Sequence, residues 1–212
     1  MNVIHTSLSE LNGIWMSFVV AVVGGYGVGK SVLTSHLQSM GLISLDVETF
    51  IGSYLLPSQN SSIFDMYINH LHKQYHLTYQ SEDALLQGRH LYRSLYDFIH
   101  SGIVSECEGT SYVVEVPSFI ALDELLDVSA SLFDYVVAVD CPVEIQLKYL
   151  MTQYRLSEPQ AKGLISVCKS RYYYMQYSTD IVLNTVEISQ LEWVASKLLT
   201  AFKAVSIYQT EV

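Results

Sequence analysis

The feature that most constrains this chain is an apolar stretch near its beginning that breaks into a glycine-rich loop. Residues 19–23 are apolar and mostly β-branched, which predicts a buried strand. Residues 24–31 read Gly-Gly-Tyr-Gly-Val-Gly-Lys-Ser, the G-x-x-x-x-G-K-[ST] spacing of a P-loop. Residues 32–38 can continue as a helix. Because backbone N–H groups and a helix N-terminus attract anions, this segment predicts a phosphate-binding site.

The residue types of the loop each suit a bound nucleotide. Glycine lets a phosphate touch bare backbone, which a side chain would block. The Lys30 ammonium is expected to reach the β- and γ-phosphates of a bound nucleotide, and the Ser31 hydroxyl to bind Mg²⁺. A nucleotide and Mg²⁺ are therefore the predicted ligands of the loop. The residues expected to hold the nucleotide are consecutive: Gly25, Tyr26, Gly27, Val28, Gly29, Lys30, Ser31 and Val32.

The composition excludes several classes of partner. With 212 residues, of which only 15% are charged, the chain fits one globular domain with an inserted subdomain. A net charge of -10 argues against nucleic acid, because binding to a phosphate backbone needs clustered Lys and Arg. The longest apolar run, residues 18–23, is too short to cross a bilayer. A small-molecule substrate is expected, with no nucleic acid and no membrane, and no oligomeric state is indicated.

The cysteines and the first residues indicate a cytoplasmic protein. Cys107, Cys141 and Cys168 are scattered and lack C-x-x-C spacing, so inert thiols in a reducing compartment are expected. Residues 1–15 contain no Lys or Arg, which argues against a signal peptide. Because Met16 lies directly before the first strand, we expect either a dispensable extension or a physiological start at Met16.

A carboxylate follows the next predicted strand. Residues 42–45 form a short run that ends at Asp46, at the carboxyl end of a parallel strand, where open α/β sheets bind ligands. Asp46 can cap the helix expected over residues 47–56. It can instead act as a base or a metal-water ligand facing the P-loop, supplemented by Glu48.

A second carboxylate lies near the end of the strand predicted over residues 112–117. Glu115 stands where P-loop proteins hold Mg²⁺ through water, so Ser31 and Glu115 are the candidate metal ligands. The alternation of the strand leaves a solvent-facing position open as well, because Glu115 lies opposite Val114 and Val116.

Residues 58–105 show helical spacing and are predicted to form an insertion over the sheet edge. Arg89 and Arg93 are four residues apart and share a helix face. They are candidates for gripping a substrate phosphate, and an ordinary solvated face is the alternative.

Residues 144–177 follow an apolar strand over 135–140 and read as two helices around a break at 157–159. Such a hairpin beside a P-loop sheet is a candidate lid. At least one of its basic residues is expected to contact phosphate, although a generic exposed helix pair would also be basic. A strand over 181–184 and a helix over 189–204 complete the pattern. The basic residues of the candidate lid are Lys148, Arg155, Lys162, Lys169 and Arg171.

The predicted fold is α/β, a P-loop NTPase-type parallel five-stranded sheet flanked by helices, with a helical substrate-binding insertion and a helical lid. The predicted division is residues 1–15 as an N-terminal extension, residues 16–57, 106–142 and 178–212 as the core, residues 58–105 as the insertion and residues 143–177 as the lid.

Several strings resemble the dephospho-coenzyme A kinases, over residues 18–202. The P-loop is close to the family's Gly-Gly-Ile-Gly-Ser-Gly-Lys-Ser, and residues 45–48 match its Asp-Ala-Asp segment. Residues 132–147 follow its fourth strand and lid entry. Residues 180–184 match its closing Asp-x-Val-Ile-x-Asn with a shift of one residue. The resemblance thus covers nearly the whole chain.

The resemblance implies roles for three further residues. It implies that Asp46 is the catalytic base and that Asn184 lies near the adenine. The family's Pro-Leu-Leu-Phe-Glu becomes Pro-Ser-Phe-Ile-Ala over residues 117–121. This change keeps Pro117 as a candidate substrate contact and loses the acidic residue.

The lid departs from the family pattern. Its Gln-x-x-Arg-x-x-x-Arg reads Gln146-x-x-Tyr149-x-x-x-Gln153, so both arginines are absent at their expected places. Arg155, two residues later, is the candidate substitute. A lid arginine neutralises charge that develops on the transferred phosphoryl group, so its loss would slow the reaction by several powers of ten.

The resemblance implies ATP-dependent phosphorylation of the ribose 3′-hydroxyl of dephospho-CoA, the last step of coenzyme A biosynthesis. One alternative is a related P-loop kinase for a nucleoside or nucleotide, which the change at residues 117–121 favours. Another is a nucleotide-binding protein with weak or no transfer activity, which the absent lid arginines support. Intact Lys30, Ser31 and Asp46 favour a kinase.

Overall fold

The structure is a computed structural model. Predictions for the extension at residues 1–15, for most of the insertion, for Asp46 and for Arg89 lie outside the described residues. The structure describes residues 17–45, 47, 50, 93–103, 109–118, 120–129, 132–185 and 188–208.

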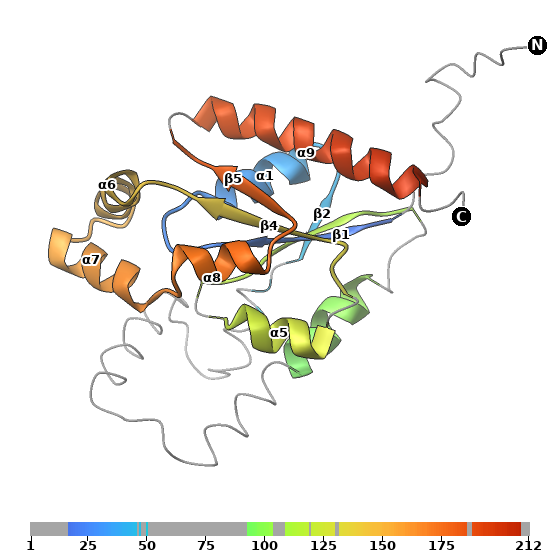
Figure 1. Ribbon diagram of the computed structural model, residues 1–212, viewed down its shortest axis with the longest axis horizontal. Coiled ribbons are helices and arrows are strands. Elements are labelled where there is room, and N and C mark those ends of the chain that lie inside the picture. Colours follow the sequence, from blue (N-terminus) through green and yellow to red (C-terminus); the bar gives the residue numbers. More distant parts are fainter. Residues whose placement is uncertain are drawn as a thin grey trace, which may run out of the picture.

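A parallel five-stranded sheet forms the centre of the molecule, in the order β2-β3-β1-β4-β5 (Figure 1). This arrangement confirms the predicted sheet and places the P-loop strand between two others. Every neighbouring pair is parallel, so all five carboxyl ends meet at one edge. The strands are β1 (Val19–Val23), β2 (Ile43–Leu45), β3 (Tyr112–Glu115), β4 (Tyr135–Asp140) and β5 (Asp180–Leu183).

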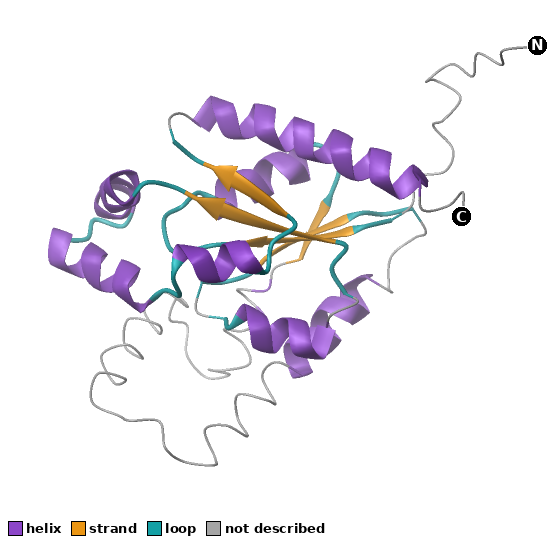
Figure 2. Ribbon diagram, viewed as in Figure 1, coloured by secondary structure: helices purple, strands orange, loops and turns teal. Residues whose placement is uncertain are grey.

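Helices cover both faces of the sheet (Figure 2). One face carries α1 and α9, and the other carries α5, the helix at residues 93–103, and α8. None of the helices in the described part of the chain is both long and apolar enough to span a membrane. The helices are α1 (Lys30–Ser39), α5 (Leu122–Ser129), α6 (Val143–Gln153), α7 (Glu158–Val167), α8 (Arg171–Gln176) and α9 (Ile188–Tyr208).

Alternate residues of β1 enter two separate cores. Val19, Ala21 and Val23 pack toward the α5 side, whereas Val20 and Val22 pack toward α1 and α9. All five are buried, because both faces of the strand are covered. The uninterrupted apolar run of β1 is therefore the pattern that a central parallel strand requires.

The region predicted as a two-helix lid contains three helices, α6, α7 and α8. The first break matches the prediction, since the Ser157 backbone N–H donates to Gln160 Oε1 at 2.9 Å where α7 begins. A second break follows α7, and the Ser170 hydroxyl accepts a hydrogen bond from the Tyr173 backbone N–H at 3.1 Å. This cap starts α8 as a separate helix. The terminal helix α9 also runs further than the predicted residues 189–204.

Candidate nucleotide-binding site

The P-loop connects β1 to α1 at the carboxyl edge of the sheet, next to β3 and β4. Gly24 and Gly29 have backbone φ angles of 144° and 104°. A Cβ at Gly24 would lie 2.4 Å from the Val139 carbonyl oxygen, and one at Gly29 would lie 2.6 Å from Asn184 Nδ2. Both positions therefore require glycine for conformation and for space. The glycine spacing read from the sequence has a direct structural cause.

Lys30 is a buried cation whose ammonium bonds to the backbone of this loop. Its Nζ donates to the carbonyl oxygens of Gly24 at 3.1 Å and Gly25 at 2.9 Å, and to Ser118 Oγ at 2.7 Å. Only 7% of the residue is exposed. Buried ammonium groups need such acceptors. The bond to Ser118 was not foreseen, because Ser118 follows β3, 88 residues away along the chain.

The two candidate metal ligands, Ser31 at the start of α1 and Glu115 at the end of β3, come together. Ser31 Oγ donates to Glu115 Oε1 at 3.0 Å. Glu115 is half-buried at the end of β3, paired in register with Val22 of β1. The described residues contain no cluster of three or more His, Cys, Asp or Glu side chains that could hold a metal. The pair fits Mg²⁺, which binds few protein oxygens and keeps water and phosphate ligands.

Asn184, the residue after β5, contacts the backbone of the P-loop. Its Nδ2 donates to the Val28 carbonyl oxygen at 2.9 Å, and its backbone N–H donates to the Asp140 carbonyl oxygen at 2.7 Å. These bonds join the ends of β4 and β5 to the loop. Asn184, predicted near the adenine, is thus adjacent to the loop itself.

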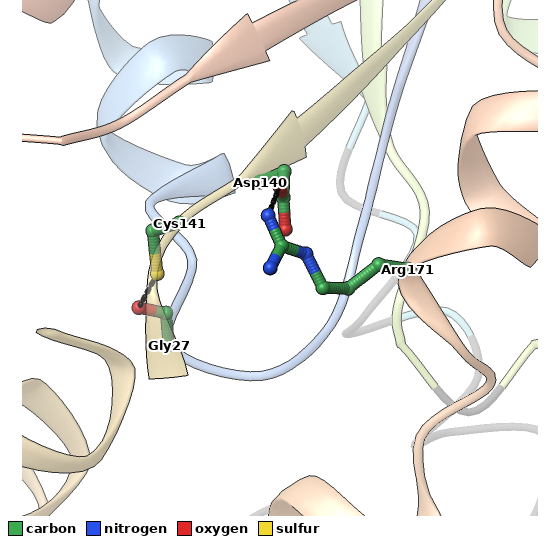
Figure 3. Close-up of polar contacts among 4 residues, drawn as sticks. All are labelled: Gly27, Asp140, Cys141 and Arg171. Carbon is green, nitrogen blue, oxygen red and sulfur yellow. Dashed lines mark hydrogen bonds and ion pairs between the residues drawn. The ribbon is translucent and has the colours of Figure 1, made fainter. Parts of the chain in front are cut away.

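Gln146 and Cys141 also contact the loop backbone from the β4 side. Gln146 Nε2 donates to the Tyr26 carbonyl oxygen. Figure 3 shows the other contact, in which Cys141 Sγ donates to the Gly27 carbonyl oxygen at 4.0 Å. Burial, with a smaller effect from the neighbouring Asp140 charge, raises the pKa of the Cys141 thiol to about 11. Cys141 is therefore a protonated, inert thiol at neutral pH, as the sequence predicted.

An ion pair joins β4 to α8 beside the loop. The guanidinium of Arg171, the first residue of α8, donates to Asp140 Oδ2 at the end of β4 (Figure 3). The hydrogen bond and the charge of Asp140 raise the pKa of Arg171 above its ordinary value. The sequence pattern distinguishes Arg171 from the other basic lid residues in no way of its own. The signal that could have distinguished it is Asp140, a carboxylate at the end of an apolar parallel strand.

A cavity of about 180 Å³ opens between the P-loop, β4 and the lid helices. Gly25 and Val28 of the P-loop line it, together with Lys169 and Arg171. Two basic residues thus line the same cavity as a loop whose sequence predicts phosphate binding.

The other predicted site residues lie apart from this cavity. Arg155 is exposed between α6 and α7, has a φ of 53°, and is not among the residues lining the cavity. Arg93 is exposed in the helix at residues 93–103, 3.7 Å from Asp97 and over the Tyr96 ring. Pro117 is half-buried directly after β3, next to Ser118.

Comparison with curated proteins finds relatives named dephospho-CoA kinase. That of Aromatoleum aromaticum is 25% identical over 190 residues, which cover 82% of this chain and 88% of the relative. That of Idiomarina loihiensis is 24% identical over 209 residues, or 92% of this chain and 100% of the relative. No protein-family model matches the chain. These relatives confirm the resemblance read from the sequence and the divergence that accompanies it.

Solved structures support the fold. TT1252 from Thermus thermophilus is similar with a TM-score of 0.62 and 14% identity, covering 88% of this chain and 98% of that one. A shikimate kinase from Acinetobacter baumannii is similar with a TM-score of 0.54 and 13% identity, covering 90% and 96%. The chain has the fold of a P-loop kinase, as predicted.

Proposed function

We propose that this chain is a divergent dephospho-CoA kinase, an ATP-dependent phosphotransferase that phosphorylates the ribose 3′-hydroxyl of dephospho-CoA. The observation that carries the proposal is the likeness to dephospho-CoA kinases over 82% or more of the chain. The P-loop geometry, with Lys30 and Ser31 in place, supports it. The product would be coenzyme A, so the reaction would complete coenzyme A biosynthesis.

The P-loop would hold the ATP donor. Backbone N–H groups of residues 25–32 would surround the phosphates, together with the N-terminus of α1. Lys30 would exchange its bonds to the Gly24 and Gly25 carbonyl oxygens for the β- and γ-phosphate oxygens. Asn184 would lie near the adenine, from a position already fixed against the loop.

Ser31 and Glu115 would hold Mg²⁺, Ser31 directly and Glu115 through water. When bound, the metal would neutralise charge on the β- and γ-phosphates. The hydrogen bond between Ser31 Oγ and Glu115 Oε1 supports this assignment, because it already brings the two oxygens to one place.

The acceptor would bind on the β2 and β3 side of the loop. Asp46, the residue after β2, would accept the proton of the 3′-hydroxyl. At the same time, the 3′-oxygen of the acceptor would form a bond to the γ-phosphorus of ATP. The bond from that phosphorus to the β,γ-bridging oxygen breaks, and ADP leaves. Arg89, Arg93 and Pro117 would contact the acceptor. The exposed pair of Arg93 with Asp97 competes only weakly, since such pairs stabilise by about 0–1 kcal/mol.

The lid, residues 143–177, would close over the nucleotide and exclude water, with Arg155 as the lid cation. Arg155 would have to move with the lid to reach the phosphates. The insertion at residues 58–105 would bind the small-molecule acceptor. The protein would act in the cytoplasm and would bind neither nucleic acid nor a membrane.

A direct assay tests the proposal. Purified chain is mixed with ATP, Mg²⁺ and one acceptor at a time, including dephospho-CoA, nucleosides and nucleotides, and ADP formation is measured for each. ADP formation that requires dephospho-CoA and is abolished by Asp46→Asn supports the proposal. Turnover with a nucleoside or nucleotide alone would assign a related kinase, and ATP binding without turnover would assign a nucleotide-binding protein.

A further inference from the structure

We infer that Arg171, anchored by Asp140, contacts the terminal phosphate of the bound nucleotide and supplies a cation that the lid lacks at Tyr149 and Gln153. The inference rests on the proposed function for its effect on turnover. Its effect on nucleotide affinity requires only that ATP binds at the P-loop.

Arg171 lies beside the P-loop and lines the same cavity. Its side chain extends from α8 to the end of β4, beside the P-loop (Figure 3). Strand β4 is the direct neighbour of β1, and Gly25, Val28 and Arg171 line one cavity. A phosphate on the loop backbone at this side would therefore face the guanidinium across that cavity.

The burial of the two partners is unequal. The Asp140 side chain is 7% exposed, whereas that of Arg171 is 57% exposed. A buried carboxylate requires a partner, which fixes one edge of the guanidinium. A guanidinium has five N–H donors in a planar fork, and Asp140 is its one hydrogen-bond partner within the described part of the chain. The remaining edge can bind a phosphate while Asp140 stays bound.

The helix that carries Arg171 is also tied to the Lys30 side of the loop. Tyr174, one turn later on α8, donates its hydroxyl proton to the Ser118 carbonyl oxygen at 3.1 Å. Ser118 Oγ in turn accepts from Lys30. The neighbouring Tyr173 donates its hydroxyl proton to Asp123 of α5. Although α8 belongs to the lid region at residues 143–177, these bonds to Ser118 and to α5 hold Arg171 at a set place relative to Lys30.

Arg155 provides the contrast within the same region. It is exposed in a loop and its backbone has the left-handed φ of 53°. An arginine that is already placed loses less side-chain freedom on binding phosphate than one that must move. Arg171 is therefore expected to contact bound nucleotide from the place that it already occupies, whereas Arg155 would have to move.

The test combines affinity and turnover. Binding of ATP and of ADP, each with Mg²⁺ and without acceptor, is measured by calorimetry for the native chain and for Arg171→Ala. Loss of one phosphate contact is expected to weaken ATP binding about tenfold and ADP binding less than about threefold. Turnover with dephospho-CoA is expected to fall about 10²–10³-fold, and Arg171→Lys is expected to recover part of it.

A double variant separates phosphate contact from a merely structural role. Arg171→Ala leaves Asp140 buried without its partner, which by itself destabilises the fold. Arg171→Ala with Asp140→Asn removes that charge and should restore the thermal unfolding midpoint. It should leave ATP affinity and turnover low.

Asp140→Asn alone should lower turnover by about tenfold, because the guanidinium is then poorly oriented. Lys197→Ala, which removes an exposed cation of α9 outside the lid, is the control and should change neither ATP affinity nor turnover.

Two results would overturn the inference. One is recovery of turnover in the double variant, which would make Arg171 a counter-ion of Asp140 and nothing more. The other is an unchanged ratio of ATP to ADP affinity in Arg171→Ala. If the native chain binds ATP but shows no turnover with dephospho-CoA, the proposed function fails, and the affinity ratio still decides the role of Arg171.

Discussion

The two sides of the P-loop differ in what they hold. On the β3 side, Ser118 and Glu115 bond to Lys30 and Ser31, the side chains expected to bind phosphate and metal. On the β4 side, the bonds go to the loop backbone, for example from Asn184 to the Val28 carbonyl oxygen.

The difference separates two tasks of the site. Contacts on the β3 side hold groups that meet the reacting phosphate, and contacts on the β4 side set the shape of the loop. Arg171 is the exception on the β4 side, because its guanidinium forms an ion pair with Asp140 and does not bond to the loop backbone.

The largest effect is expected from Lys30→Met. The substitution removes the ammonium that would stabilise charge on the phosphates, so turnover should fall at least about 10²–10³-fold. The Gly24 and Gly25 carbonyl oxygens also lose a donor, so the free energy of unfolding should fall by about 1–3 kcal/mol. Kinetic assays and chemical unfolding check the two expectations together. A larger loss of stability would mean that the β3 side also holds the loop in shape.

Glycine-to-alanine substitutions probe the loop shape on the β4 side. Gly29 and Gly41 both have a φ of 104°, but only Gly29 has a neighbour in the way, Asn184 Nδ2 at 2.6 Å from a Cβ. Gly41→Ala measures the conformational cost alone, about 1–2 kcal/mol. Gly29→Ala should cost that amount and about 1–3 kcal/mol more from overpacking.

Chemical unfolding of both variants measures this difference. Adding Asn184→Ala to Gly29→Ala should recover part of the excess cost, because it removes the obstructing amide. Equal costs at Gly29 and Gly41 would show that the Asn184 contact does not hold the loop.

Glu115→Gln should produce a smaller effect on the β3 side. The amide can still accept a hydrogen bond from Ser31, but it loses the charge that holds a metal-bound water. We expect the Mg²⁺ concentration for half-maximal turnover to rise about tenfold, a difference of about 1.4 kcal/mol. Titration of Mg²⁺ at saturating ATP measures it. An unchanged Mg²⁺ requirement would remove Glu115 from the metal site.

The smallest effect is expected at Cys141, through pH. Its pKa is raised from 9.0 to about 11 in the folded chain, so the thiol stays protonated to a higher pH in the folded state than in the unfolded state. This contribution to stability is fully present below pH 9 and is lost as the pH rises toward 11. Urea unfolding between pH 8 and pH 11 should therefore show a shallower alkaline decline for Cys141→Ala than for the native chain. Parallel declines would mean that Cys141 does not contribute.

Local sequence patterns predicted much of the fold and part of the site. The apolar runs of β1 and β4 indicated strands, and the two cores show that both faces of each are covered. The glycine spacing and Lys30 could be read directly, because a loop of eight residues holds its own geometry. The extra break before α8 was missed, although Ser170 is a typical N-cap residue.

Long-range partners could not be predicted in the same way. Ser118 reaches Lys30 across 88 residues, and Arg171 reaches Asp140 across 31. Each pairing depends on which strands are neighbours, and a sequence pattern contains no strand order. The roles of Asp46 and Arg89 stay predictions, because both lie outside the described residues.

The sequence by itself determined the P-loop, because its conformation depends on glycine at positions where a side chain has neither the φ angle nor the space. It also determined that parallel strands would flank that loop. Only the tertiary structure decided which charges surround it. Placing β1 between β3 and β4 brings Glu115 and Ser118 to one side and Asp140 with Arg171 to the other. Electrostatic partners act through distances in space, and the order of the strands sets those distances.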